Sequence, residues 1–278
     1  MCELLAISSQ FPTHTGFSLE KLTRHSHYDE VSKLSNPDGW GVAYYEDKDV
    51  NILREPLAAN ESKLVQFIEQ NIPPTQLLIL HIRKATFGAR AIRNTHPFSR
   101  ELGGCMHVFA HNGDANAIQE NDNFSLGRFQ CVGETDSEYA FCSLLNQLVP
   151  LWENKQGIIP PLEDRFEVIS TFAQKLSELG PANFLYADSD VLFAHADKRT
   201  QDDGIIKPPG LTMLTRQCDN EIIQGLTDSG LNFSHAKQQE SLPQEVTIIA
   251  SVPLTDESWH PLKEGELVML SKGRQVYI

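Results

Sequence analysis

The chain has 278 residues, of which 40% are hydrophobic and 22% charged, and its net charge is -14. This balance is that of a folded globular protein with room for one large domain or two ordinary ones. The acidic charge and the scattered Lys and Arg residues argue against nucleic acid as a partner. No stretch approaches the ~20 apolar residues of a membrane span. The start lacks a basic segment followed by an apolar one, so we expect a cytoplasmic protein.

The cysteines are five in number, widely spaced and without a CxxC pair: Cys2, Cys105, Cys131, Cys142 and Cys218. In a reducing compartment this pattern indicates free thiols and neither a disulfide framework nor a zinc site. The histidines form no HExxH motif. We therefore expect no bound metal and no cofactor.

Apolar runs of strand length recur along the chain, from CELLAIS at the amino terminus to RQVYI at the carboxyl terminus. Helical spacing appears at residues 18–34, 60–72, 135–149 and 162–179, and the third of these segments begins with Thr135 and Glu138 at capping-box spacing. Strands in runs with few helices predict an α+β fold of antiparallel sheets covered by helices. Residues 150–161 resemble a surface connection without a domain boundary, and residues 197–209 and 227–244 resemble polar loops.

The chain begins MCELLAIS, with a cysteine directly behind the initiator methionine. One interpretation is that Cys2 is simply the first small residue of a buried strand. The other is that removal of Met1 leaves a cysteine that carries both a thiol and a free α-amino group. Position alone does not separate the two.

Two further motifs carry charged side chains that could meet a substrate. In HIRKAT, Arg83 closes an apolar strand, and its guanidinium can form a bidentate pair with a carboxylate of the protein or of a ligand. In GETDSE, Asp136 falls in the first turn of a predicted helix, where the helix dipole alone is an adequate explanation for a carboxylate. Asp136 could equally bind an ammonium group.

The motif AHNGD has two interpretations as well. Asn112 and Gly113 form an NG pair, which is a strong signal for a hairpin turn. Alternatively, the Asn112 side-chain amide and the Gly113 backbone N–H form a pair of donors for a developing oxyanion. Combined with a nucleophile, an arginine and an aspartate, the second interpretation suits an α-amino acid with a side-chain amide, which is glutamine or a γ-glutamyl compound.

The ordered motifs MCELL, DGWG, HIR, NTHPF, AHNG and VGETDSE, with the late PLT that precedes Trp259, resemble the class II glutamine amidotransferases. These are amino-terminal nucleophile hydrolases, and the resemblance is to their stand-alone YafJ-like branch over nearly the whole chain. It implies a four-layer αββα sandwich of two antiparallel sheets, with residues 1–278 as one glutamine amidotransferase domain and a mature chain that begins at Cys2.

By matching position, the resemblance implies a role for each candidate. Cys2 corresponds to the nucleophile, Arg83 to the binder of the substrate α-carboxylate, and Asp136 to the partner of the α-amino group. Asn112 and Gly113 correspond to the oxyanion hole.

The chain also departs from the family pattern. Lys84 stands where the amidotransferase of hexosamine synthesis has an aromatic residue, and Phe87 stands in place of a histidine, so details of the pocket are not carried over. In DGWG we favour a structural role for the glycines beside Asp38 and Trp40. We expect His96 to pack near the site without a catalytic role.

Three functions fit this inventory. The first is a glutaminase that supplies ammonia to a separate synthase subunit. The second is a free-standing hydrolase of γ-glutamyl peptides or amides. The third is a regulatory subunit that binds glutamine without turnover.

Overall fold

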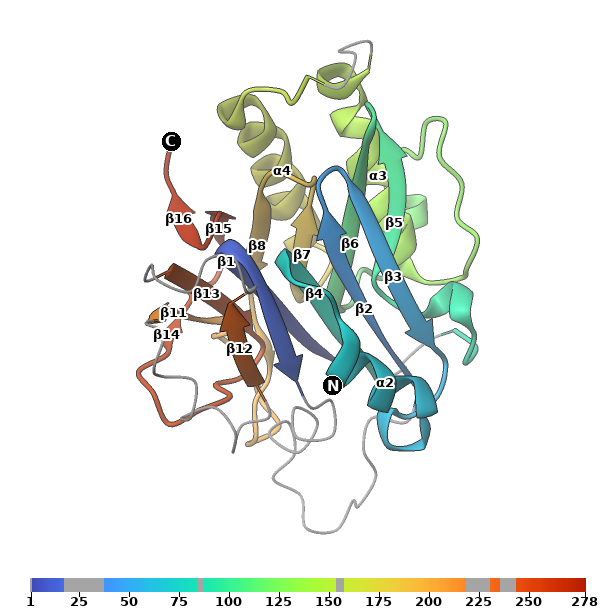
Figure 1. Ribbon diagram of the computed structural model, residues 1–278. Coiled ribbons are helices and arrows are strands. Elements are labelled where there is room, and N and C mark those ends of the chain that lie inside the picture. Colours follow the sequence, from blue (N-terminus) through green and yellow to red (C-terminus); the bar gives the residue numbers. More distant parts are fainter. Residues whose placement is uncertain (1, 18–37, 85–87, 154–157, 219–230, 236–243) are drawn as a thin grey trace.

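A computed structural model describes residues 2–17, 38–84, 88–153, 158–218, 231–235 and 244–278 of the chain. Within them, one eight-stranded antiparallel sheet, here sheet A, has the order β14-β11-β13-β1-β4-β2-β3, and β12 pairs with β1 (Figure 1). Its strands are β1 (Glu3–Phe17), β2 (Gly39–Glu46), β3 (Asp49–Glu55), β4 (Thr75–Arg83), β11 (Thr212–Cys218), β12 (Leu231–His235), β13 (Gln244–Ala250) and β14 (His260–Pro261).

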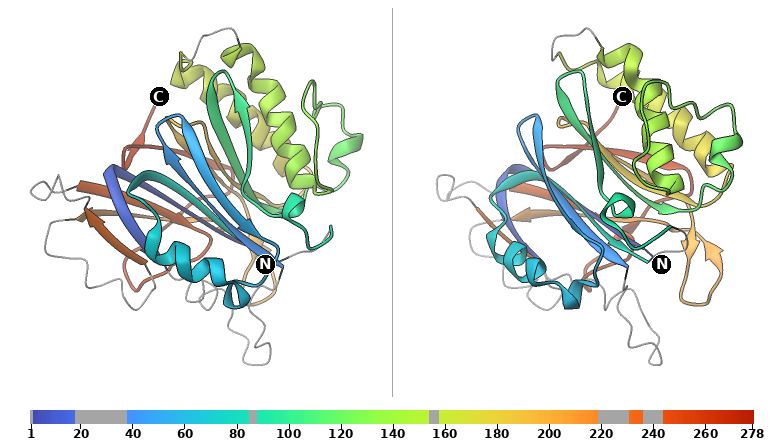
Figure 2. Two further views of the ribbon diagram at one scale, coloured as in Figure 1. Left: turned by 45° about the vertical axis from the view of Figure 1, so that its right-hand side comes forward. Right: turned by 90° about the vertical axis from the view of Figure 1, so that its right-hand side faces the viewer.

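The second sheet, sheet B, has six antiparallel strands in the order β16-β15-β8-β7-β6-β5. They are β5 (Phe98–Leu102), β6 (Cys105–Gly113), β7 (Ala182–Ala187), β8 (Leu192–Ala196), β15 (Glu266–Ser271) and β16 (Arg274–Val276). The two sheets lie face to face, with α2 (Lys63–Asn71) outside sheet A and α3 (Asp136–Trp152) and α4 (Leu162–Ser177) outside sheet B (Figure 2). The expected αββα sandwich is therefore confirmed.

The alternation of side chains along each strand builds three apolar layers. On β1, Leu4 and Ala6 belong to the core between the sheets, whereas Leu5 and Ile7 belong to the core beneath α2. A third core joins the outer face of sheet B to α3 and α4. Because both faces of both sheets are covered, the central strands are apolar on both sides.

Local signals explain where the helices begin. Ser62 caps α2 by accepting a hydrogen bond from the Val65 backbone N–H, and Thr135 caps α3 by accepting one from the Glu138 N–H. Three short 3₁₀ turns, η1 (Ala59–Glu61), η2 (Ile92–Asn94) and η3 (Ile118–Glu120), complete the helical elements that the structure describes. Only half of the predicted capping box forms, because the Glu138 carboxylate binds other backbone groups.

One alternative is excluded and two expectations need correction. Asn112 and Gly113 are not a hairpin turn, because they lie in β6 and pair with Asn183 and Ala182 of β7, far along the chain. The polar stretch 197–209 contains a small hairpin of β9 (Arg199–Thr200) and β10 (Ile206–Lys207). The stretch 227–244 contains β12, because the exposed edge of β1 supplies it with a pairing partner. The helix expected at residues 18–34 lies outside the described residues.

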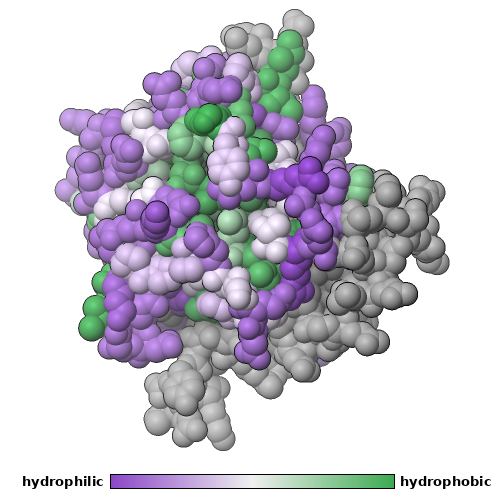
Figure 3. Space-filling model, turned by 90° about the vertical axis from the view of Figure 1, so that its left-hand side faces the viewer, coloured by the Kyte–Doolittle hydropathy of each residue, from purple (hydrophilic) through white to green (hydrophobic). Residues whose placement is uncertain are grey.

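On the side where β11, β14 and β16 lie in Figure 1, hydrophilic residues surround a band of hydrophobic ones (Figure 3). None of the helices in the described ranges is long and apolar enough to cross a membrane.

Candidate active site

Cys2 and Arg83 lie side by side at one end of sheet A. The antiparallel register of β1 and β4 pairs Glu3 with Ile82, and one further step brings Cys2 next to Arg83. Arg83 alternates with the apolar residues of β4 that face α2, so it is on the face that looks toward sheet B. The structural interpretation of Cys2 is supported, since this residue does precede a buried strand.

The Cys2 thiol is held by the backbone of Lys84. The Lys84 N–H donates to Sγ over 3.2 Å, and the thiol lies 3.3 Å from the Lys84 carbonyl oxygen, to which it can donate. Burial raises the pKa of the Cys2 thiol, and the hydrogen bond from the Lys84 N–H acts in the opposite direction. Both contacts use backbone atoms and the Lys84 side chain is exposed, so neither contact depends on which side chain this position carries.

Sheet B brings Asn112 to the same place. Its side-chain Nδ2 donates to the Cys2 carbonyl oxygen over 2.8 Å. The end of β6 in sheet B therefore contacts the residue that precedes β1 of sheet A. Gly113 follows, and a Cβ there would lie 1.8 Å from the Pro181 carbonyl oxygen. Only glycine therefore fits beside β7 at this position.

Arg83 is held by a loop that it helps to shape. Its Nη1 donates to the Ala89 carbonyl oxygen and its Nη2 to that of Gly88, each over 3.3 Å. The Arg83 residue is only 3% exposed, and burial lowers its pKa. These contacts point the guanidinium at the loop of residues 88–94, close to Cys2.

Asp136 is the first residue of α3 and is fixed by backbone donors. Its Oδ2 accepts from the Ala115 N–H over 2.7 Å, and its Oδ1 accepts from the Ser137 N–H over 2.8 Å. The first of these bonds ties the start of α3 to the segment that follows β6. Asp136 remains partly exposed. The carboxylate thus keeps capacity for a further donor.

Two residues that the sequence reasoning did not single out connect Arg83 with Asp136. Asn94 donates to the Ala89 carbonyl oxygen and to Glu134, and its Oδ1 accepts from the Glu134 N–H. Glu134 also accepts from Ala89 N and pairs with Arg93 over 2.8 Å. Asn94 belongs to the motif NTHPF and Glu134 to the motif GETDSE. Their place in these motifs is the only sequence signal that could have identified them.

Beneath the site, neutral histidines fill the sandwich. The rings of His96 and His81 pack against each other in a tilted arrangement, with centroids 4.3 Å apart. Burial lowers the pKa of His81 to about 3 and that of His96 well below its usual value. Gly41 permits this packing, since a Cβ there would lie 2.2 Å from the His96 carbonyl oxygen. Trp40 is fully buried in the core beneath α2, so the structural interpretation of DGWG is supported.

The structure describes three further cysteine side chains. Cys105, Cys131 and Cys142 are free thiols. The described part of the chain holds no group of three His, Cys, Asp or Glu side chains that could bind a metal ion.

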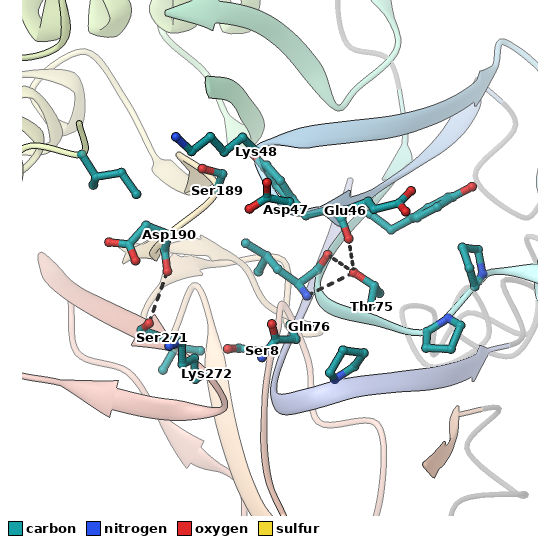
Figure 4. Close-up of a pocket in the computed structure, with 18 residues that line it drawn as sticks. Ser8, Glu46, Asp47, Lys48, Thr75, Gln76, Ser189, Asp190, Ser271 and Lys272 are labelled. Carbon is teal, nitrogen blue, oxygen red and sulfur yellow. Dashed lines mark hydrogen bonds between the residues drawn. The ribbon is translucent and has the colours of Figure 1, made fainter. Parts of the chain in front are cut away.

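A cavity of about 690 Å³ lies at the opposite end of the sandwich, where the turns after β2, β7 and β15 meet (Figure 4). Thr75 lines it at one end of β4, and Arg83 is at the other end, roughly 25 Å away at ~3.3 Å per residue. None of the five candidate residues lines this cavity. The candidate site is instead the place where Cys2, Arg83 and Asn112 meet.

Comparison with known proteins identifies the family. The family model "Glutamine amidotransferases class-II" matches residues 1–278. This chain belongs to the class II glutamine amidotransferases. The "Putative glutamine amidotransferase YafJ" of Escherichia coli K12 is 31% identical over 278 residues, which are 99% of this chain and 100% of that protein.

Solved structures of amidotransferases share the fold. A predicted glutamine amidotransferase from Pseudomonas aeruginosa superposes with a TM-score of 0.67 at 29% identity over the whole of both chains. The glutamine phosphoribosylpyrophosphate amidotransferase of Bacillus subtilis superposes with a TM-score of 0.59 at 14% identity, over 99% of this chain and 48% of its own. The second similarity, at low identity, concerns the fold alone.

Proposed function

We propose that this class II amidotransferase hydrolyses the side-chain amide of glutamine through a γ-glutamyl thioester on Cys2. The observation that carries the proposal is the 2.8 Å hydrogen bond from Asn112 Nδ2 to the Cys2 carbonyl oxygen, because it brings Cys2, the residue before β1, next to the Asn112 amide of sheet B. A nucleophile beside a donor pair is the arrangement that acyl transfer requires.

The proposed active form begins at Cys2, within one glutamine amidotransferase domain of residues 1–278. Removal of Met1 would free an α-amine with a reference pKa of about 7.7–8.0, which is well placed to accept a proton near neutral pH. Because burial raises the pKa of the Cys2 thiol, such a base is needed to form the thiolate. The amine would take the thiol proton directly or through one water.

The proposed reaction has two steps, acylation of Cys2 and hydrolysis of the thioester. The thiolate attacks the γ-carbonyl carbon, the oxyanion accepts hydrogen bonds from Asn112 Nδ2 and the Gly113 N–H, and the amine returns the proton as ammonia leaves. Water then attacks the thioester, the C–S bond breaks, and glutamate and the Cys2 thiol are released. Each donor of an oxyanion hole typically contributes ~10²-fold or more to kcat.

Arg83 and Asp136 recognise the substrate by its two charges in this proposal. Arg83 would pair with the α-carboxylate beside Cys2, and Asp136 would accept hydrogen bonds from the α-ammonium group. Their support is geometric, since both are held by hydrogen bonds with neighbouring backbone atoms. Such preorganisation reduces the entropy lost on binding.

The proposed partner is an ammonia-accepting synthase subunit. The support is the family to which this chain belongs, the class II glutamine amidotransferases, since an amidotransferase passes ammonia to an acceptor. A synthase partner would be expected to raise a weak basal glutaminase rate.

The test is a substrate screen on protein whose mass confirms that it begins at Cys2. Glutamine, γ-glutamyl peptides and γ-glutamyl amines are each incubated with wild type, Cys2→Ala and the control Cys131→Ala, and glutamate and ammonia are measured. Cys131 is a partly exposed free thiol outside the site. We expect Cys2→Ala to lose turnover and still bind glutamine, and Cys131→Ala to match the wild type.

Each other outcome decides between the functions. Preference for a γ-glutamyl conjugate over glutamine would indicate the γ-glutamyl hydrolase, and binding without turnover by the processed protein would indicate the regulatory subunit. Full activity of Cys2→Ala, or of a chain that keeps Met1, would refute the mechanism.

A further inference from the structure

The proposed nucleophile and the proposed oxyanion donor come from different sheets, so something must set the distance between them. A closed ring of contacts joins the two. The Asn112 side chain donates to the Cys2 carbonyl oxygen, and the next residue, Glu3, pairs with Arg199. The residue before Arg199 is Lys198, whose carbonyl oxygen accepts from Asn183. The Asn183 side chain also donates to the Asn112 carbonyl oxygen and so closes the ring.

The first half of the ring is a buried ion pair at the start of β1. Arg199 Nη2 lies 3.0 Å from Glu3 Oε1, and the two side chains are only 5% and 8% exposed. Arg199 Nη1 donates to the Ser251 carbonyl oxygen over 2.7 Å, and Ser251 is itself hydrogen-bonded to Leu4. Arg199 therefore holds the residue that follows Cys2 and the end of the neighbouring strand β13.

The second half of the ring is a single buried amide. Asn183 is 1% exposed, and its Nδ2 donates to the carbonyl oxygens of Asn112, over 3.1 Å, and Lys198, over 2.9 Å. Its Oδ1 accepts from the Asp197 N–H over 2.8 Å. Gly210 leaves the amide its space, since a Cβ there would lie 1.6 Å from Asn183 Oδ1. Three of the four hydrogen-bonding positions of this amide are thus used.

Residues 197–199 consequently touch both halves of the candidate site. They lead into the β9–β10 hairpin, which is orange in Figure 2 and lies beside the amino terminus. Arg199 reaches sheet A at Glu3, and Lys198 reaches sheet B at Asn183. The polar composition of residues 197–209 gave no sign of this, because the partners are distant in sequence.

We propose that Arg199 and Asn183 are positioning residues that set the Cys2 thiol against the Asn112 donor. The inference rests on the proposed function, because it assigns the ring a role in the attack step. Neither residue touches the substrate charges, which Arg83 and Asp136 would hold. Loss of the ring should therefore lower kcat and leave KM nearly unchanged, since displacements of about 1 Å can cost ~10²-fold in rate.

The experiment uses the full-length processed protein. Arg199→Lys keeps the charge and loses one of the two planar contacts, and Asn183→Asp keeps the shape and loses both donated hydrogen bonds. For each variant, the melting temperature, kcat and KM for glutamine, and the rate of Cys2 alkylation by iodoacetamide are measured, with the labelled site assigned by peptide mass.

Two controls separate positioning from folding. Arg165→Lys alters another buried arginine, 4% exposed, which pairs with Asp188 and Asp190 over 2.8 Å each on the far side of sheet B. It should lower the melting temperature and leave kcat unchanged. Lys198 contributes only its backbone carbonyl to the ring. Lys198→Ala removes the side chain and keeps that carbonyl, so this variant should behave as wild type.

We expect Arg199→Lys and Asn183→Asp to lower kcat at least 10-fold, to change KM less than 3-fold, and to alter the alkylation rate of Cys2. The inference is overturned if folded Arg199→Lys keeps the wild-type kcat, or if the loss appears in KM. It is also overturned if Arg165→Lys, at the same melting temperature as Arg199→Lys, shows an equally large loss of kcat. If the wild type turns over no substrate, the proposed function fails, and the alkylation rates still test whether Arg199 and Asn183 position Cys2.

Discussion

Replacement of Asp136 by Asn tests the recognition of the substrate α-ammonium group. The change preserves shape and removes one negative charge. Asp136 accepts hydrogen bonds from Ala115 N through Oδ2 and from Ser137 N through Oδ1, which leaves capacity on the carboxylate for an ammonium donor. At an effective dielectric constant of about 20, unit charges about 3 Å apart attract by about 5.5 kcal/mol.

Most of that attraction is offset when water is removed from both groups. Hydrogen bonds to charged groups contribute about 1.5–3 kcal/mol net. Because every ~1.4 kcal/mol is tenfold, Asp136→Asn should raise KM for glutamine about 12- to 150-fold. The kcat should change little, because the charge is held equally in the ground state and the transition state.

The assay compares glutamine with glutaramate, the analogue that lacks the α-amino group. Wild type should lose affinity for glutaramate by a similar factor, and Asp136→Asn should discriminate hardly at all between the two compounds. Asp114→Asn, which alters a nearby exposed carboxylate, is the control and should change KM less than 2-fold. If Asp136→Asn weakens both compounds by the same factor, the proposed pairing is wrong and the effect is structural.

Gly113→Ala should separate β6 from β7, because its Cβ would lie 1.8 Å from the Pro181 carbonyl oxygen. We expect a loss of about 1–3 kcal/mol in the free energy of unfolding and at least a 10-fold lower kcat. A wild-type melting temperature with full activity would contradict this. Burial lowers the pKa of His107 to about 4, so its stabilising contribution is present above about pH 6.5 and is lost as pH falls from there to about 4, by up to about 3 kcal/mol. Urea unfolding at pH 7 and at pH 4.5 should show that His107→Gln loses less stability between the two pH values than wild type does. Glu138→Gln should cost about 1.5–3 kcal/mol in thermal or urea unfolding, because the buried Glu138 carboxylate pairs with Arg100 and accepts hydrogen bonds from the Val132 and Gly133 N–H groups. An unchanged stability would show that the charge of Glu138 contributes nothing.

Several elements of the fold follow from local chemistry. The apolar runs predicted the strands, since fully covered sheets require apolar residues on both faces. The helices at residues 60–72, 135–149 and 162–179 correspond to α2, α3 and α4, with ends displaced by a few residues. Thr135 was recognisable as a cap because capping depends on neighbours in the chain.

The sequence alone determined the family, the αββα architecture that the family implies, and which residues are candidates for the site. The motifs could be read in order because each is a short contiguous stretch, whose spacing is a property of the chain itself. A single motif was ambiguous, as the NG pair at Asn112 and Gly113 illustrates, because turn and strand propensity are both local and cannot report a pairing with β7.

Only the tertiary structure decided how the candidates meet. Asn112 contacts Cys2 from the opposite sheet, and Asn94 and Glu134 join the loop at Arg83 to the start of α3. The backbone of Lys84, and not its side chain, holds the Cys2 thiol. These contacts join segments far apart in sequence, and their geometry depends on register and on the packing of two sheets, which no local pattern contains.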